Sequence, residues 1–333
     1  MSPLPAEPPA AVSAAPAPAP ARPSASRLAM RVAAGLALLG LVIWYADPRA
    51  LWQELRGANP WWFVLAVVVA TAANFVAAAR WAIIARGLGL LAPYGRLVRM
   101  YARGITTNIV LPGATLSGDL LRSVQLSRLG NPFGASALSV FLDRVSGLWM
   151  LCGLSLLSAC GLTAWKAATG GGPNLSLQEL MLYVVVLATV VALPLIPLPF
   201  ARLERSQRRW IAGLATYWER LERAVLQARP ALLSSVWRAF GVQFLSTSTL
   251  WICGLCVGVT LPYPVMLAAA APIFVTASLP IGIGGFGTRE VAAVVILGMA
   301  GVAGEQAVAT SLLYGLASVV QGILAAPLFF TRT

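Results

Sequence analysis

Long apolar segments, almost free of charged residues, alternate with short polar segments along most of the chain. A helix needs about 20 mostly apolar residues to cross the hydrocarbon core of a membrane, so we predict an all-α polytopic membrane protein with about eight transmembrane helices. The predicted spans cover approximately residues 28–46, 60–79, 135–161, 179–200, 238–259, 264–279, 290–301 and 307–330. The seventh span is short, which is typical of one half of a broken or re-entrant pair.

Two segments are predicted to lie outside the bilayer core. Residues 1–26 are rich in proline and alanine, and such a composition predicts a disordered cytoplasmic tail. Residues 27–333 then form a single transmembrane domain. Within it, residues 201–230 place apolar side chains such as Trp210 and Leu214 at helical spacing opposite arginines. This pattern predicts a cytoplasmic amphipathic helix on the inner leaflet, and a solvated connector is the alternative.

The composition agrees with a membrane location, because 59% of the residues are hydrophobic and only 11% are charged. The formal net charge of +13 raises the question of nucleic-acid binding. The arginines lie between apolar spans, however, where the retention of positive residues on the cytoplasmic side accounts for them. We therefore predict no nucleic-acid partner. Only Arg49, Arg56 and Lys166 lie in the loops assigned to the outside, which predicts a bacterial inner (plasma) membrane protein with both termini in the cytoplasm.

Several kinds of chemistry lack their usual residues. The sequence contains no histidine, which excludes imidazole metal sites and nucleophiles activated by a Ser-His-Asp triad. Cys253 and Cys256 form a CxxC pair without a second pair of ligands, so we interpret them as packing residues. No GxxxxGK[ST] sequence for binding ATP is present. The sequence thus indicates neither a metal nor a cofactor, and we do not expect an enzyme.

Charged residues inside or beside the apolar spans form three clusters. An unpaired charge at the centre of a bilayer costs at least about 2.5 kcal/mol, so such residues are candidates for function. The first cluster lies in residues 105–122, where Pro112 and Gly118 interrupt a short apolar stretch before Asp119 and Arg122. We predict a re-entrant or broken segment that lines a polar cavity. The alternative is a surface turn with an exposed ion pair.

The second cluster is the adjacent pair Asp143 and Arg144, about two turns into the span 135–161. Neighbouring residues of a helix point about 100° apart, so at least one of the two must find a partner on another helix. Two interpretations remain open and are compatible. The pair could lock helices together, or it could contact a ligand.

The third cluster lies in residues 278–290, where a G-x-G-x-x-G pattern includes Gly284 and Gly287. A dinucleotide site is rejected, because no β-strand and no βαβ unit accompany the pattern. A glycine-rich break between two membrane half-helices fits better. Such a break presents backbone N–H groups and a helix N-terminus to an anion, and Arg289 beside Glu290 adds a full positive charge.

The three clusters together contain three acidic residues and three arginines, and Arg80 adds one further positive charge. If they converge in space, they form a site that is nearly neutral when empty and accepts a phosphate by exchanging ion-pair partners. No catalytic residue is predicted. The candidate substrate-binding residues are Arg80, Gly118, Asp119, Arg122, Asp143, Arg144, Gly284, Gly287, Arg289 and Glu290.

In this order, the clusters resemble the lysylphosphatidylglycerol synthase transmembrane-region family of flippase-like membrane proteins, over roughly residues 28–330. The family has a Pro-Gly…Gly-Asp…Arg segment, an acidic-Arg pair, and a Pro…Gly-x-Gly…Arg-Glu segment. The corresponding residues here are Pro112, Gly113, Gly118, Asp119 and Arg122, then Asp143 and Arg144, then Pro280, Gly282, Gly284, Arg289 and Glu290. A glycine is usual in the family where Ser117 stands.

The resemblance implies translocation of a lipid. Because the sequence ends directly after its last span, it leaves no room for the soluble aminoacyl-transferase domain of the synthases, and we do not expect it to make lysylphosphatidylglycerol. We expect a flippase-like lipid translocator or lipid-binding protein. Its ligand would be an anionic phospholipid or a polyprenyl-phosphate-linked lipid, held in a cytoplasm-facing polar cavity.

Two alternatives remain. An intramembrane glycosyl or lipid transferase would need acidic residues near the outer surface, where Asp47, Glu54 and Glu305 are scattered. A non-catalytic membrane subunit of a lipid or glycolipid pathway would tolerate the loss of the intramembrane charges. A lipid-modifying enzyme or a glycosyltransferase is the expected protein partner, and the oligomeric state is open.

Overall fold

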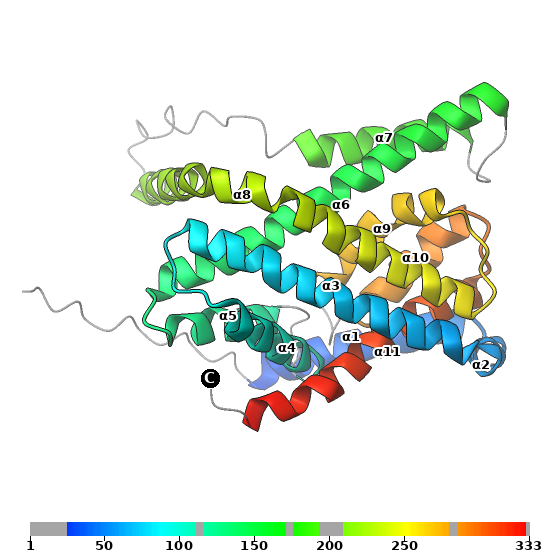
Figure 1. Ribbon diagram of the computed structural model, residues 1–333. Helices are drawn as coiled ribbons and strands as arrows, with labels where there is room; N and C mark the ends of the chain where they lie inside the picture. The colour runs from blue at the N-terminus through cyan, green and yellow to red at the C-terminus, as the bar shows by residue number, and fades with distance from the viewer. Residues whose placement is uncertain (1–24, 111–115, 171–175, 193–208, 280–284, 331–333) are drawn as a thin grey trace, which may run out of the picture.

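The computed structural model describes residues 25–110, 116–170, 176–192, 209–279 and 285–330 (Figure 1). In these residues the chain forms eleven α-helices, one short 3-10 helix and no β-strand, which confirms the all-α prediction. The helices are α1 (Ala25–Tyr45), α2 (Pro48–Gly57), α3 (Pro60–Gly87), α4 (Tyr94–Val110), α5 (Leu116–Ser127), α6 (Phe133–Thr169), α7 (Leu177–Ala192), α8 (Arg209–Cys256), α9 (Tyr263–Ala277), α10 (Thr288–Met299) and α11 (Gly304–Ala325), followed by η3 (Ala326–Phe330).

Four of the described helical segments are long and apolar enough to cross a membrane. They are α3, α6, the part of α8 from Ala228 to Cys256, and α11 with η3. Shorter apolar helices accompany them, so the chain is a polytopic α-helical membrane protein. The number of crossings stays a prediction. The 12-residue α10 spans only about 18 Å at 1.5 Å per residue, which is less than the roughly 30 Å of the hydrocarbon core.

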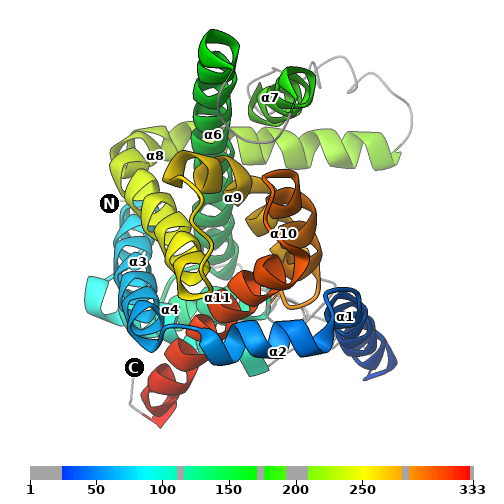
Figure 2. The ribbon, with the colours of Figure 1, turned by 90° about the vertical axis from the view of Figure 1, so that its right-hand side faces the viewer.

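The long helices run side by side, and α3 packs along α8 (Figure 1). Small side chains let the two backbones approach closely: a Cβ atom on Gly87 would collide with Ala231. The helix α2 lies across one end of the bundle, between α1 and α3 (Figure 2). Asp47 and Asn59 cap the first backbone N–H groups of α2 and α3 with their side chains, which fixes the two sharp corners in this connection.

Two helical hairpins complete the bundle. The first consists of α4 and α5, the second of α9 and α10, and the two helices of each hairpin pack against each other. The hairpins occupy opposite halves of the bundle along its length (Figure 1). The breaks predicted near residues 105–122 and 278–290 are therefore confirmed, although residues 111–115 and 280–284 lie outside the described part of the chain.

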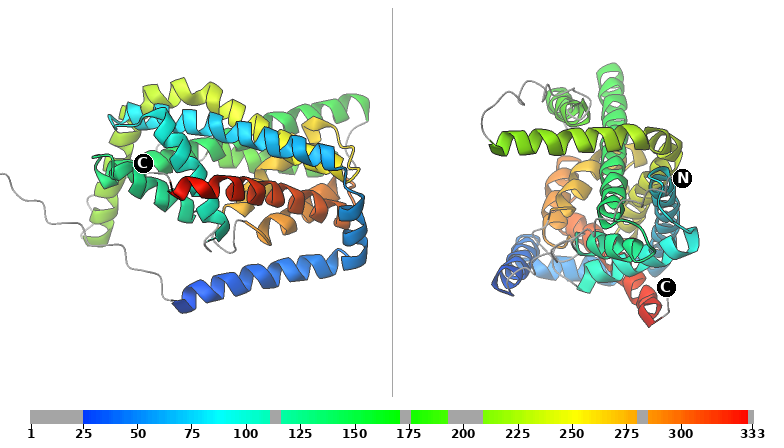
Figure 3. Two further views of the ribbon diagram at one scale, coloured as in Figure 1. Left: turned by 60° about the horizontal axis from the view of Figure 1, so that its bottom comes forward. Right: turned by 90° about the vertical axis from the view of Figure 1, so that its left-hand side faces the viewer.

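Other sequence predictions coincide with the helices only in part. The 201–230 segment overlaps the N-terminal half of α8. The helix α8 is bent (Figure 3). Pro230 lies inside this helix and is a sufficient cause of a bend, because proline cannot donate the intrahelical hydrogen bond. The amphipathic role of the segment stays a prediction. The proposed tail falls almost entirely on residues 1–24, outside the described part. The helix α1 stands apart from the main bundle along most of its length (Figure 3).

Candidate functional site

A cavity of about 300 Å³ lies inside the bundle. It is found where the C-terminal parts of α4 and α9 and the N-terminal parts of α5 and α10 meet the long helices. Its lining comes from α3, α4, α5, α6, α8, α9, α10 and α11. We call it the charged cavity. The charged residues that line it are Arg80, Asp119, Arg122, Asp143, Arg144 and Arg289. The three charged clusters of the sequence therefore converge on one space, together with Arg80.

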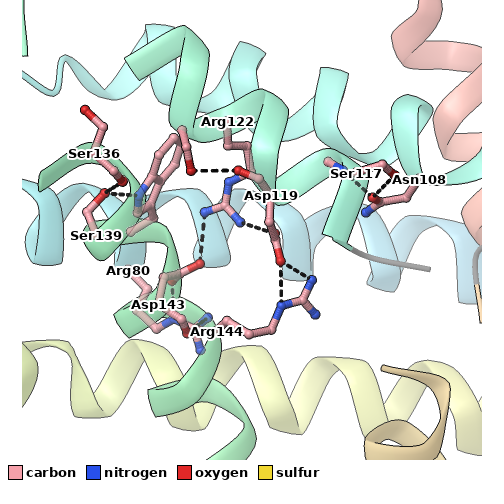
Figure 4. A network of polar contacts seen from close by, with 12 residues as sticks. Arg80, Asn108, Ser117, Asp119, Arg122, Ser136, Ser139, Asp143 and Arg144 are labelled. Atoms are coloured by element: carbon pink, nitrogen blue, oxygen red, sulfur yellow. Dashed lines mark hydrogen bonds and ion pairs between the residues drawn. The ribbon is translucent and has the colours of Figure 1, made fainter. Parts of the chain in front are cut away.

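Asp143 lies at the centre of the ion-pair network and is only 2% exposed (Figure 4). Its Oδ1 accepts a hydrogen bond from Arg80 Nε at 2.9 Å, and its Oδ2 accepts one from Arg122 Nη2 at 2.9 Å. Arg80 Nη2 also donates to the Asp143 backbone carbonyl at 2.9 Å. A single carboxylate on α6 thus joins α3 and α5, in a bundle interior where paired charges are far less costly than single ones.

Asp119 extends the network toward the more exposed side of the cavity. Its Oδ2 pairs with Arg144 Nη2 at 2.7 Å and accepts a hydrogen bond from Arg144 Nε at 2.9 Å. Its Oδ1 lies 3.4 Å from Arg122 Nη1, a long contact. The side chains of Asp119 and Arg144 are 16% and 29% exposed. The network therefore runs from a buried end at Arg80 to an accessible end at Arg144 (Figure 4).

Arg122 links the two aspartates and is held in place by aromatic rings. Its guanidinium carbon lies 4.1 Å from the centre of the Trp81 ring and 4.5 Å from that of Tyr101. Aromatic faces attract cations, so the two rings restrict Arg122 to one position between Asp143 and Asp119. Trp81 is itself fixed, because its indole Nε1 donates to Ser139 Oγ at 3.1 Å.

The first turn of α5 is fixed by Asn108, which lies on α4. Asn108 Oδ1 accepts hydrogen bonds from the Gly118 backbone N–H at 2.7 Å and from Ser117 Oγ at 3.2 Å (Figure 4). A Cβ atom on Gly118 would lie 2.6 Å from that oxygen and would also collide with the Gly104 carbonyl oxygen. Gly118 is therefore needed for the close packing of the hairpin, which points Asp119 and Arg122 at the network.

Arg289 reaches the charged cavity from the first turn of α10. Its Nη2 donates to Glu290 Oε1 at 2.9 Å, and its Nε donates to Ser311 Oγ at 3.0 Å. Ser311 in turn donates to Glu290 Oε1 at 2.8 Å, and the Gly287 N–H donates to Glu290 Oε2 at 2.6 Å. Glu290 is fully buried and is not among the described residues that line the cavity. Its carboxylate therefore positions Arg289 and the start of the helix.

The predicted site residues therefore do not all line the charged cavity. Six line the cavity as charged groups, and Gly118 also lines it. Gly287 and Glu290 belong to the N-terminal cap of α10, and Gly284 lies outside the described residues. Arg80 lies within α3 and is buried. The helix α3 continues to Gly87, and the Arg80 side chain points into the network.

Sequence reasoning missed several polar residues of the cavity. Asn74, Tyr101, Gln243 and Tyr314 all line it. Gln243 Nε2 donates to the Gly147 carbonyl at 2.8 Å, which joins α8 to α6 beside the network. A single amide within an apolar helix is the signal that could have found Asn74 and Gln243, because such groups need a polar partner or a cavity inside a membrane.

The electrostatic balance of the cavity favours an anion. Four arginines and two aspartates line it, an excess of two positive charges, and Glu290 behind Arg289 reduces the excess to one. Gly118 and Arg289 line the cavity and lie in the first turns of α5 and α10, so the N-termini of both helices are at the cavity. Helix N-termini attract negative charge. Among the described residues, Arg80 Nη1 has no hydrogen-bond partner.

These features define a multi-pass helical membrane protein with an arginine-rich cavity inside the bundle. The sequence matches the family described as lysylphosphatidylglycerol synthase TM region over residues 32–326, and the chain belongs to that family. The match includes every charged residue of the cavity and is consistent with a role connected with membrane lipids. No match to the chain was found among curated proteins.

Proposed function

We propose that the chain binds the head group of an anionic lipid in the charged cavity and moves that lipid between the two leaflets. The ligand is an anionic phospholipid or a polyprenyl-phosphate-linked lipid. The observation that carries the proposal is the convergence of four arginines, from α3, α5, α6 and α10, on one cavity whose described lining contains two carboxylates. Guanidinium groups bind phosphate oxygens through charge-assisted and often bidentate hydrogen bonds.

The phosphate binds by replacing a carboxylate at the accessible end of the network. Asp119 holds Arg144 at 2.7 Å but Arg122 only at 3.4 Å, and both members of the Asp119–Arg144 pair are partly exposed. Asp143 is only 2% exposed and holds two arginines at 2.9 Å. A phosphate can therefore take the place of the Asp119 carboxylate at Arg144 while Asp143 keeps Arg80 and Arg122 in position.

The charge balance favours an anionic ligand. The cavity together with Glu290 carries an excess of one positive charge, which a phosphodiester neutralises. The cavity volume of about 300 Å³ is at the lower end of the range for small-molecule sites, and it suits a head group rather than a whole lipid.

The proposal places the chain in a bacterial inner membrane with its termini and the mouth of the cavity on the cytoplasmic side, because the arginine-rich segments are retained there. It involves no covalent step. A lipid-modifying enzyme or a glycosyltransferase would supply or consume the lipid. The sequence has no ATP-binding P-loop, so transport runs downhill or uses an ion gradient.

Translocation can be measured in proteoliposomes from the rate at which dithionite quenches fluorescent phosphatidylglycerol or a labelled polyprenyl phosphate. We expect the native protein to accelerate quenching of the inner-leaflet lipid, and Arg144→Ala and Arg289→Ala to abolish the acceleration. Arg49→Ala is the matched control, because Arg49 is exposed on α2, away from the cavity. Equal rates in empty liposomes and in liposomes with folded native protein would exclude translocation of that lipid.

A further inference from the structure

A second cavity, of about 230 Å³, lies between α3, α4 and α11 and has a mostly apolar lining. We call it the lateral groove. Asn74, Tyr101 and Ile105 line both the lateral groove and the charged cavity. A smaller space of about 160 Å³ also touches both, through Asn74 and Ile105. The lateral groove is therefore adjacent to the charged cavity, and the two share part of their walls.

The outer side of the lateral groove faces the region that lipid occupies in a membrane. Its lining includes Phe75 of α3 and Leu324 of α11, which are 51% and 69% exposed. Exposed apolar side chains on helices that cross a membrane contact hydrocarbon. The groove thus lies between exposed apolar side chains on one side and the wall of the charged cavity on the other.

Polar groups mark the boundary between the groove and the charged cavity. Gln321 Nε2 of α11 donates to Thr71 Oγ1 of α3 at 3.1 Å. Asn74, one turn further along α3, lines the charged cavity, the lateral groove and the smaller space. The Asn74 side-chain amide has no hydrogen-bond partner among the described residues. An amide at this position can hydrogen-bond to the ester or phosphate oxygens of a molecule that passes it.

We propose that the lateral groove holds one hydrocarbon chain of the lipid whose head group occupies the charged cavity, and that the lipid enters sideways between α3 and α11. The inference rests on the proposed function and adds the route and the chain site. An amphiphile needs an apolar and a charged compartment next to each other, and the two cavities with their shared residues provide this arrangement. The chain never has to cross the arginine network.

Filling the groove separates binding of the chain from binding of the head group. Ala102 of α4 lines the lateral groove but not the charged cavity, so Ala102→Phe reduces the space for the chain. Ala167→Phe is the control, because Ala167 is exposed near the end of α6. The probes are long-chain phosphatidylglycerol and water-soluble glycerol phosphate. We expect Ala102→Phe to weaken long-chain binding by about tenfold and to leave glycerol phosphate binding unchanged.

The outcomes distinguish the two proposals. Unchanged long-chain binding in Ala102→Phe would overturn the lateral groove as the chain site and leave the proposed function intact. A native protein that binds neither probe overturns both. If Ala102→Phe does not fold, native protein can be photolabelled in liposomes with phosphatidylglycerol that carries a diazirine in its acyl chain. Crosslinks at Phe75, Val98 or Leu324 support the groove, and crosslinks confined to α6 and α7 contradict it.

Discussion

Arg80 and Asp143 are 63 positions apart in the sequence and form a two-point contact in the interior of the bundle. The Arg80 guanidinium binds both the carboxylate and the backbone carbonyl of Asp143, each at 2.9 Å. Because the same carboxylate also binds Arg122, one acidic residue pairs with two buried arginines. The stability of the bundle and the charge of the candidate site therefore depend on the same side chain.

Replacing Asp143 is expected to destabilise the protein strongly. Asp143→Asn leaves Arg80 and Arg122 without their buried carboxylate, and breaking a buried ion pair typically costs about 3–5 kcal/mol. Thermal unfolding in detergent should show a markedly lower midpoint. Glu305→Gln is the control, since Glu305 lies in the first turn of α11 and does not line the charged cavity. An unchanged midpoint for Asp143→Asn would show that the network contributes little to stability.

Gly147 is expected to be required for the position of Arg80. A Cβ atom at Gly147 would lie 2.6 Å from Arg80 Nη1, whereas a Cβ atom at Gly153 of the same helix meets nothing within 4 Å. Gly147→Ala should therefore cost about 1–3 kcal/mol, the usual range for overpacking a well-filled interior. Gly153→Ala should be neutral by the same unfolding measurement. Equal stability of the two variants would mean that Arg80 moves aside without cost.

Asp119 is expected to compete with the ligand for Arg144. Asp119→Asn removes the competing charge, and a partly exposed ion pair is worth up to about 1 kcal/mol, so affinity for glycerol phosphate should rise by up to about fivefold. Titration of the purified protein measures this change. Arg144→Ala should lower the same affinity. A lower affinity in Asp119→Asn would contradict exchange of partners and would indicate that Asp119 positions the arginines.

Gly315 is expected to be essential for Arg289. A Cβ atom at Gly315 would collide with Arg289 Nη2 and would lie 2.6 Å from the Phe286 ring, whereas a Cβ atom at Gly298 meets nothing within 4 Å. Gly315→Ala should displace the guanidinium and weaken glycerol phosphate binding by about tenfold or more, the loss expected for a hydrogen bond to a charged group. Gly298→Ala should bind like the native protein. Normal binding by folded Gly315→Ala would remove Arg289 from the site.

The sequence predicted the features that depend on local chemistry. Clustered prolines and glycines disfavour a helix, so the breaks before Asp119 and before Arg289 could be predicted without a structure. Length and apolarity predicted the long helices in the same way. The number of crossings is less predictable, because the sequence of a short apolar helix such as α10 has the same pattern whether the helix spans a membrane or ends inside a bundle.

The pairing of the charged residues could not be predicted, because it depends on how helices pack. Asp143 binds Arg80 and Arg122 and leaves its neighbour Arg144 to Asp119. Glu290 looked like a ligand-binding residue, yet it is buried behind Arg289. The rotation of a helix about its axis decides such roles, and a window of sequence constrains that rotation only weakly when apolar residues surround the whole helix.

The central claim is that the arginines form one site for an anionic lipid head group. The most direct measurement is lipid retention by native mass spectrometry, with equal amounts of phosphatidylglycerol and phosphatidylcholine offered to the purified protein. We expect native protein and Arg49→Ala to retain phosphatidylglycerol preferentially, and Arg144→Ala and Arg289→Ala each to lose about tenfold or more in affinity for it. Equal retention of the two lipids by native protein, or unchanged preference in both cavity variants, would contradict the account.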